Sequence, residues 1–420
     1  MSHSSKESNL QPGWGAAISA LAMVFVLTLV ATPTAQAQTY KVLYNFTGGM
    51  DGSTPTAGLT KDAAGNLYGT AEFGGPAGQG TVFKLSHKGS GWVFTPLYSF
   101  HGGSDGAQPA ARVIVGPDGS LYGTTIAGGD SGCFDNYGCG TVFNLRPQPR
   151  ACAAALCPWT KTVLYRFTGG SDGANPDDLI FDQAGNLYGS AGDGGLAGCN
   201  GYGCGVVYEL SPSGGGWTES VLYSFTGGND GGNPDGAVTF DQAGSLYGTT
   251  ANGGLGLGTV YKLTPSGSTW LEDVIYNFDT GAAGQAPVGP PVFDASGDLY
   301  FATANNDVDH KGGAVYELSE SHSIWTLKML WWGVEYVSGG VTLDTAANVY
   351  DTSVGDGVNT WGTVFEDMQN NQQIVLHRFT DCSEGCQPYG GVVFDVNGNL
   401  YGTASRGGVY GYGVVWEITP

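Results

Sequence analysis

The sequence predicts an all-β fold, a seven-bladed β-propeller with four antiparallel strands in each blade. Three observations support this prediction: a hexapeptide that recurs seven times, four short strand-like segments in each repeat, and no amphipathic helical pattern after the N-terminal segment. Repeats of about fifty residues are typical of propellers and solenoids, and four strands per repeat favour a propeller. We therefore expect a single propeller domain, residues 38–420, after a signal peptide, residues 1–37.

The N-terminal segment indicates export. Residues 18–31 form an apolar run, and the small-residue pattern Ala35-Gln36-Ala37 follows it, which fits cleavage after Ala37. The run is shorter than the roughly 20 residues that a spanning helix needs. We expect a secreted or periplasmic protein with no membrane span after cleavage, and an uncleaved anchor is the alternative.

The recurring hexapeptide marks the register of the repeat. Its first copy is Gly65-Asn66-Leu67-Tyr68-Gly69-Thr70, and the tyrosines of successive copies lie 50 to 66 residues apart. Side chains alternate between the two faces of a strand, so both faces must be covered, and Gly69 indicates close approach by the next blade. The other copies are residues 119–124, 185–190, 244–249, 297–302, 347–352 and 398–403.

The other segments of each repeat follow in a fixed order. A strand of the Leu-Tyr-x-Phe type leads into an Asp-Gly turn, and a short strand then ends at an Asp-x-x-Gly-Asn turn before the hexapeptide. A glycine-rich loop and a Gly-Thr-Val-Phe-x-Leu strand complete the period, as at residues 80–85. Successive loops alternate between the two ends of a propeller. The Asp-Gly turns and the glycine-rich loops therefore share one end, which we call the upper face.

The phase of the two chain ends predicts how the ring closes. The first strand, residues 40–46, is of the outer type, and the last repeat stops after three strands, at residues 414–418. Pairing these two segments would complete the seventh blade and would leave no open sheet edge.

Three strand and turn motifs together resemble the GloVer tandem repeat of bacterial secreted proteins. These are Asp-x-x-Gly-Asn-Leu-Tyr-Gly-Thr at residues 62–70, Gly-Thr-Val-Phe-x-Leu at residues 80–85, and the Leu-Tyr-x-Phe strand with its Asp-Gly turn. The resemblance covers nearly all of residues 40–420. It implies a propeller and export, but no particular reaction.

Charge and cysteine content restrict the partners and the compartment. The net charge is −22 and no cluster of Lys or Arg occurs, so nucleic acid is not expected as a partner. The eight cysteines form close pairs without zinc-site spacing, which predicts local disulfides in an oxidising compartment. The expected pairs are Cys133 with Cys139, Cys152 with Cys157, Cys199 with Cys204, and Cys382 with Cys386.

The acids of the Asp-Gly turns are the candidate metal ligands. An aspartate before glycine ordinarily caps a tight turn with its own side chain, and this is the simpler interpretation. Carboxylate and carbonyl oxygens are also what calcium prefers, so calcium is the cofactor we expect if a metal is bound. The acids are Asp51, Asp105, Asp172 and Asp230, with Glu384 at the equivalent place.

Aromatic residues among the glycines of the upper loops are the candidate ligand-binding residues. Such rings could stack on sugars, although packing of one loop on another explains them equally well. Trp331 and Trp332 join them because they replace an Asp-Gly turn, in a region where residues 305–310 and Asp351 also depart from the repeat. That departure indicates either drift or a specialised site. The upper-loop aromatics are Phe134, Tyr137, Tyr202, Trp361, Tyr410 and Tyr412.

Residues for catalysis are few. No His-x-x-x-His spacing and no Gly-x-Ser-x-Gly elbow occurs, and the paired cysteines leave no free nucleophile. We expect a monomeric scaffold that binds a glycan or a cell-surface partner. The alternative is a metal-assisted hydrolase, lyase or lactonase at the mouth of the channel, and a purely structural repeat protein is a third interpretation.

Overall fold

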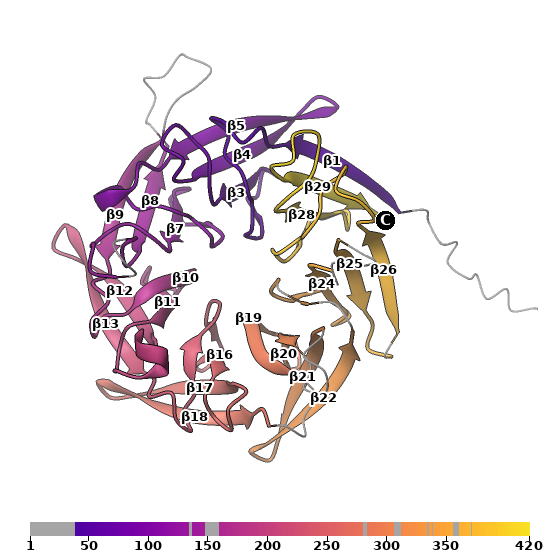
Figure 1. The fold of residues 1–420 in the computed structure, drawn as a ribbon. Helices are drawn as coiled ribbons and strands as arrows, with labels where there is room; N and C mark the ends of the chain where they lie inside the picture. Colours follow the sequence, from indigo (N-terminus) through magenta and orange to yellow (C-terminus); the bar gives the residue numbers. More distant parts are fainter. Residues whose placement is uncertain are drawn as a thin grey trace, which may run out of the picture. The chain divides into compact units, whose positions relative to one another are not determined.

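The computed structural model describes residues 38–133, 137–147, 159–279, 284–305, 312–333, 336–337, 339–355, 361–370 and 372–420. Within them the chain forms seven antiparallel sheets arranged around a common axis (Figure 1), which confirms the predicted propeller. Among these residues no helix is long and apolar enough to cross a membrane.

Blades one to three each contain four strands, numbered from the channel outwards. Blade one has β2 (Thr60–Lys61), β3 (Leu67–Ala71), β4 (Thr81–Lys88) and β5 (Gly91–Ser99). Blade two has the short helix η1 (Gly103–Asp105) before it, and then β6 (Ile114–Val115), β7 (Leu121–Thr125), β8 (Thr141–Arg146) and β9 (Thr160–Arg166). Blade three has β10 (Ala174–Phe181), β11 (Leu187–Asp193), β12 (Val206–Ser213) and β13 (Gly216–Ser224), with η3 (Cys199–Gly201) between β11 and β12.

Blades four to six repeat the same order. In blade four the inner strand is divided into β14 (Gly232–Pro234) and β15 (Thr239–Phe240), followed by β16 (Leu246–Asn252), β17 (Thr259–Ser266) and β18 (Thr269–Asn277). Blade five has β19 (Gln285–Phe293), β20 (Leu299–Asn305), β21 (Ala314–Ser321) and β22 (Ile324–Trp332). Blade six has β23 (Thr342–Leu343), β24 (Val349–Ser353), β25 (Thr363–Asp367) and β26 (Gln373–Arg378).

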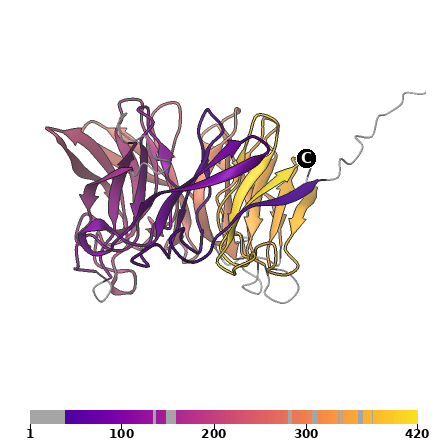
Figure 2. The same cartoon turned by 90° about the horizontal axis from the view of Figure 1, so that it is seen from above.

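Blade seven joins the two ends of the chain. Its inner strands are β27 (Val393–Phe394), β28 (Leu400–Ala404) and β29 (Val414–Thr419), and β1 (Thr39–Asn45) is its outermost strand. The register pairs Tyr40 with Ile418 and Asn45 with Val414, so the predicted closure is confirmed. Figure 2 shows the indigo strand β1 beside the yellow C-terminal strands.

The hydrophobic core consists of one layer between each pair of neighbouring blades. Leu67 and Leu85 of blade one share a buried cluster with Val415 of blade seven, whereas Tyr68 and Val82 point the other way, towards blade two. Because both faces of each sheet are covered in this way, the strands are apolar in continuous runs. The ring is stabilised by seven such layers.

The structure explains why Tyr68 and Gly69 recur in the hexapeptide. The Tyr68 hydroxyl donates to Asp62 Oδ2 at 3.0 Å, and the same carboxylate accepts hydrogen bonds from Asn66, so the lower turn and the marker strand stabilise each other. The expectation for Gly69 is wrong in one respect. A Cβ there would lie 2.6 Å from Phe83 Cζ, on the adjacent strand of the same blade, and not against the next blade.

Candidate functional site

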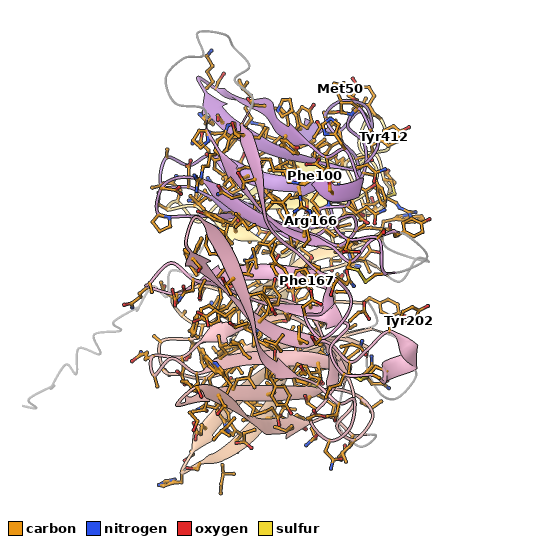
Figure 3. All side chains as sticks on the ribbon, turned by 90° about the vertical axis from the view of Figure 1, so that its left-hand side faces the viewer. Met50, Phe100, Arg166, Phe167, Tyr202 and Tyr412 are labelled. Carbon is orange, nitrogen blue, oxygen red and sulfur yellow. A yellow bond between two sulfur atoms is a disulfide. The ribbon has the colours of Figure 1, made fainter. Side chains whose placement is uncertain are left out.

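The loops predicted to share the upper face lie together. Ser53, just after the Asp-Gly turn of blade one, bridges to Phe73 in the glycine-rich loop, and the Gly75 amide donates to the Gly49 carbonyl at 2.8 Å. Figure 3 shows Met50, Tyr412 and Tyr202, from three different loops, along the same side of the ring. One end of the propeller therefore carries both loop types.

The turn aspartates are occupied by their own turns. Asp51 accepts hydrogen bonds from the Thr47 amide (2.8 Å), the Thr47 hydroxyl (2.5 Å) and the Tyr44 hydroxyl (2.9 Å). Asp172 and Asp230 repeat this pattern with Thr168 and Tyr165 and with Thr226 and Tyr223, respectively. These contacts favour the interpretation of the aspartates as turn caps.

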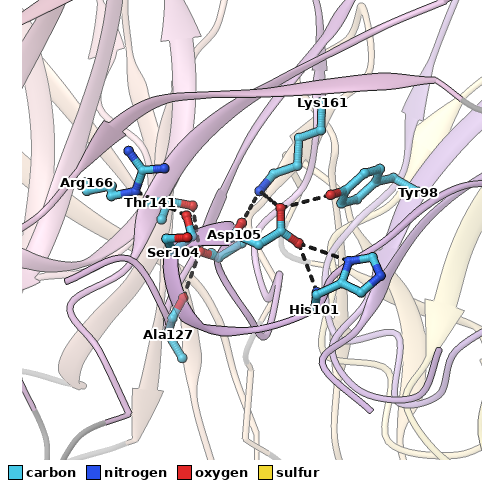
Figure 4. A network of polar contacts seen from close by, with 9 residues as sticks. Tyr98, His101, Ser104, Asp105, Ala127, Thr141, Lys161 and Arg166 are labelled. Carbon is cyan, nitrogen blue, oxygen red and sulfur yellow. Dashed lines mark hydrogen bonds and ion pairs between the residues drawn. The ribbon is translucent and has the colours of Figure 1, made fainter. Parts of the chain in front are cut away.

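Asp105 differs because cationic side chains surround it. It accepts from the His101 amide (2.9 Å) and the Tyr98 hydroxyl (2.8 Å), and Lys161 Nζ lies 3.0 Å from its Oδ1 (Figure 4). Burial acts to raise the pKa of Asp105, but the hydrogen bonds and Lys161 hold it below the ordinary value of an aspartate. Asp105 is therefore a partly buried anion with its own counter-ion, Lys161.

The five predicted metal ligands belong to separate blades. Glu384 contributes its carbonyl oxygen to the Tyr40 hydroxyl at 2.7 Å. Across the described part of the chain, no three His, Cys, Asp or Glu side chains gather closely enough to hold a metal by themselves. A calcium site built from the five turn acids together therefore has no support in this geometry, and calcium binding stays a prediction.

The predicted aromatic residues are exposed on the upper face. The exposed fraction ranges from 41% to 69% among Tyr137, Tyr202, Trp361, Tyr410 and Tyr412. Tyr412 also packs on the Asp-Gly turn of blade one. Its ring lies so close to Gly48 that a Cβ on that residue would be 2.7 Å away. They lie in loops of blades two, three, six and seven, so they form no single cluster.

Trp331 has a packing role, since its ring centroid lies 5.2 Å from that of Phe365 in the layer between blades five and six. The Trp332 side chain, Phe134 and residues 306–311 lie outside the described residues. Asp351, on β24, is fully buried, and burial raises its pKa to about 8, with the charge of Asp367 acting in the same direction.

Three of the predicted disulfides are confirmed. Cys133–Cys139 and Cys199–Cys204 close glycine-rich loops of the upper face, and Cys382–Cys386 closes the turn that leads into blade seven. Cys152 and Cys157 lie outside the described residues. Three disulfides are typical of proteins that mature in an oxidising, extracytoplasmic compartment.

The channel holds a group of charged residues that the motif analysis did not identify. A cavity of about 210 Å³ lies on the axis, and inner segments of all seven blades line it. Most lining residues are small or apolar. The charged side chains of the lining are Arg112 from blade two, Asp177 and Asp178 from blade three, and Asp235 from blade four.

These charged groups are linked across blades. Arg112 Nε lies 2.8 Å from Asp178 Oδ2, and the Arg112 amide donates to Asp178 Oδ1 at 2.7 Å. Asp177 Oδ2 accepts from the Gly236 amide at 2.7 Å. Burial raises the pKa of Asp178 to about 6 despite Arg112, and burial together with the charge of Asp177 raises the pKa of Asp235. Asp178 and Asp235 therefore hold their protons more strongly than free aspartates do.

A second cavity, of about 300 Å³, opens beside this group and is lined by blades two, three and four. Its polar lining is Asn175, Asp177, Asp193, Asn233 and Asp235, and Pro176, Pro234, Ile126 and Ala251 form apolar walls. We call this cavity the mouth pocket. It combines a few hydrogen-bonding groups with apolar surface, which is the usual composition of a small-ligand site.

The backbone holds the two asparagines of the mouth pocket in place. Asn175 and Asn233 have φ angles of 58° and 52°, a left-handed conformation that asparagine tolerates better than most residues. The backbone amide of Asn175 donates to the Cys139 carbonyl (3.0 Å), and that of Asn233 donates to the Cys204 carbonyl (2.8 Å). Each carbonyl belongs to the disulfide-closed loop of the preceding blade. Asn175 Nδ2 then reaches Asp193 Oδ2 at 3.3 Å, and Asn233 Nδ2 reaches Gly192 O at 2.8 Å.

A signal for these residues exists in the sequence. A left-handed residue followed by a proline recurs at Pro55, Pro109, Pro176, Pro234, Pro287 and Pro388. The position after five of these prolines lines the axial cavity, and Val288, after Pro287, packs against the core instead. That position holds Asp only in blades three and four, at Asp177 and Asp235. Alignment of the repeats on this proline would have identified the acids.

Comparisons with known proteins agree with the fold. A family model described as the Gloeobacter/Verrucomicrobia repeat matches residues 22–197 and 136–337, in line with the GloVer resemblance. No curated protein matches the sequence.

Solved structures of similar fold include two propeller enzymes. An ulvan lyase of a new polysaccharide lyase family has a TM-score of 0.53 at 11% identity, over 88% of this chain and 94% of that chain. A putative 6-phosphogluconolactonase from Bacteroides uniformis has a TM-score of 0.52 at 13% identity, over 86% of this chain and 99% of that chain. At these identities the likeness concerns the fold alone.

Proposed function

The chain belongs to the Gloeobacter/Verrucomicrobia repeat family, and we propose that it is an extracytoplasmic binding protein that holds a neutral, hydroxyl-rich ligand in its channel mouth. An uncharged oligosaccharide is the ligand class that fits best. The mouth pocket supports this proposal, because five Asp and Asn side chains converge there between apolar walls.

The chemistry of the mouth pocket suits hydroxyl groups. Carboxylate oxygens accept hydrogen bonds from hydroxyls, and amide groups both donate and accept. Pro176 and Pro234 add flat apolar surface against which a sugar ring could pack. The carboxylates and amides are held by other residues of blades three and four, so little ordering would be needed on binding.

The charge of the site favours a neutral ligand over an anionic one. Arg112 is the cationic side chain in the lining of the axial cavity, and Asp178 already neutralises it. Three further acids, Asp177, Asp193 and Asp235, border the mouth pocket in a chain of net charge −22. An anionic saccharide would therefore meet repulsion.

The expected test uses a panel of saccharides and a matched pair of variants. We expect calorimetry with neutral gluco-, xylo- and chito-oligosaccharides to show binding of at least one class, and oligogalacturonate to show none. Asp193→Ala should weaken that binding by about tenfold, because it removes one ligand hydrogen bond worth about 1.4 kcal/mol. Glu320→Ala, on the far β21–β22 hairpin, should leave it unchanged.

Three results would overturn the proposal. They are an absence of binding to all neutral probes at millimolar concentration, binding of oligogalacturonate alone, and full affinity in Asp193→Ala. Circular dichroism of both variants would establish that the fold is kept.

A hydrolase is the second candidate, and the carboxyl groups of the channel favour it. Burial and the charge of Asp177 raise the pKa of Asp235 to about 7, and a carboxylic acid that keeps its proton near neutral pH can act as a general acid. If the neutral ligand is also cleaved, Asp235→Asn should abolish turnover while binding is retained. Equal loss of both would assign Asp235 to binding alone.

A further inference from the structure

In blades two and four, two positions on the outer strand lie beside the Asp-Gly turn. In blade two they are Lys161, opposite Leu145, and Arg166, opposite Thr141. The same register in blade four gives Glu272, opposite Leu263, and Asn277, opposite Thr259. The repeat therefore places two cationic residues in one blade where it places two oxygen-bearing residues in another.

In blade two these positions supply cations to the turn. The Lys161 side chain is 3% exposed, its ammonium lies 3.0 Å from Asp105 Oδ1, and it also donates to the Asp105 carbonyl. Arg166 Nε donates to the Ser104 carbonyl at 3.1 Å. Figure 4 shows Lys161 beside the Asp105 carboxylate, and Arg166 beside Ser104. The oxygens around this turn thus bind a positive charge that the chain itself provides.

In blade four the corresponding space is open and lined by oxygens. A cavity of about 470 Å³, which we call the rim pocket, is lined by Asn229, Asp230, Gly254, Leu255, Glu272, Val274 and Asn277. Glu272 Oε1 and Asn277 Oδ1 are buried and have no hydrogen-bond partner among the described residues. Buried oxygens without a hydrogen-bond partner are costly, and a cation bound between them would satisfy both.

We propose that the rim pocket of blade four binds a divalent cation of the calcium type through Asp230, Glu272 and Asn277. Two carboxylates, an amide oxygen and nearby backbone carbonyls are the hard oxygen ligands that calcium prefers. The bound ion would occupy the place that the Lys161 ammonium takes in blade two. This inference does not depend on the saccharide site.

The acidic groups around the rim pocket lie close enough to interact with one another. Burial and the charge of Asp230 raise the pKa of Glu272 to about 7, and Asp273 and the Tyr223 hydroxyl are the other titratable neighbours. Blade three repeats the carboxylate pair as Asp172 and Glu219 but has Ser224 at the Asn277 position, so we expect weaker binding there.

The test compares two variants of adjacent residues. We expect calorimetry with CaCl₂ at pH 8 to show binding by the unmodified protein and a rise in its melting temperature. Glu272→Gln should weaken the affinity at least tenfold. Asp273→Asn makes the same charge change on the exposed, opposite face of β18, so it should lower the affinity much less, through the loss of its more distant charge alone.

A substitution taken from blade two provides an independent arm. Glu272→Lys should raise the melting temperature in calcium-free buffer, because it supplies the ammonium that Asp105 has in Lys161, and it should remove the calcium response of this pocket. Absence of calcium binding in the unmodified protein, or equal affinity in Glu272→Gln, would overturn the proposal. So would a Glu272→Lys protein that folds but keeps the full calcium response.

Discussion

Replacing Gly80 with alanine is expected to lower the free energy of unfolding by about 3–5 kcal/mol, enough to remove most of the margin of a typical domain. Gly80 has a φ angle of 97°, and a Cβ there would overlap Pro109 of blade two and lie 2.6 Å from the Glu72 carbonyl oxygen. The same glycine-against-proline contact recurs at Gly140, Gly205, Gly258, Gly362 and Gly413. The substitution therefore strains a contact between neighbouring blades that occurs at every blade junction but one.

Gly65→Ala is the matched control for Gly80→Ala. Gly65 also belongs to blade one and has a φ angle of 81°, but no atom lies within 4 Å of the position of its Cβ. It should lose only about 1 kcal/mol, which is the cost of the left-handed backbone. Urea denaturation of the two variants separates the effects. Equal losses would show that the contact between blades contributes nothing.

Asp367→Leu is expected to stabilise the protein by about 2 kcal/mol at pH 8. Asp367 lies opposite Val349, in the register where the other blades have Leu85, Leu145, Leu210, Leu263, Leu318 and Ile418. It is 2% exposed, and neither carboxylate oxygen has a partner with hydrogen-bond geometry among the described residues, although Gln373 lies opposite. The substitution replaces a buried, unsatisfied acid with the residue type of the repeat.

The gain from Asp367→Leu should depend on pH. Burial raises the pKa of Asp367 to about 7 in the folded protein, whereas an unfolded aspartate titrates near its ordinary value of 3.8. Between these two values the folded state binds more protons than the unfolded state, so this residue makes the protein less stable as the pH rises from about 4 to 7. The difference in stability between Asp367→Leu and the unmodified protein should grow over that range and level off above it.

Asp367→Asn distinguishes titration from burial. It keeps the size and polarity of the side chain but cannot ionise, so it should remove the pH dependence without the full gain of leucine. Thermal melts at pH 5, 6, 7 and 8 would measure both variants. A gain from leucine that is constant across pH, or a loss at every pH, would contradict the proposed role of the buried acid.

The fold was predictable because its signals are local and repeated. The hexapeptide around Tyr68 joins a turn to a buried strand. The hydrogen bond from the Tyr68 hydroxyl to Asp62 fixes the strand to the turn, and the two residues are only six positions apart. Closure was predictable as well. Each end of the chain has a strand without a partner, and pairing the two strands with each other removes both open sheet edges. The short separations of the disulfides made three bridges predictable on the same grounds.

The channel site was harder to predict because its members are distant in the sequence and unremarkable in their local context. Arg112 and Asp178 are 66 residues apart, and Asp177 contacts Gly236 across 59 residues. Pro176 is the local signal for Asp177, and it becomes informative only when the repeats are compared with one another. The upper-loop aromatics were conspicuous in the sequence, yet the structure distributes them over four blades.

The residues of the rim pocket were only partly predictable from the sequence. Asp230 was identified as a candidate cation ligand, but Glu272 and Asn277 were not, because their role follows from the register of β17 and β18. Comparison of that register between blades is what exposes the exchange of Lys161 and Arg166 for Glu272 and Asn277. In a repeat protein, such comparisons carry information that no single motif contains.

The most direct test of the ring on which both proposed sites depend is a disulfide between β1 and β29. Thr39 and Thr419 face each other in the register, so Thr39→Cys with Thr419→Cys should form an intramolecular bridge on mild oxidation. Thr39→Cys with Val396→Cys is the control, because the turn after β27 lies at least two strands, about 10 Å, from β1. The account predicts a monomer whose peptide map links residues 39 and 419. Free thiols, a dimer linked between chains, or equal cross-linking of the control pair would contradict closure of the propeller by its first strand.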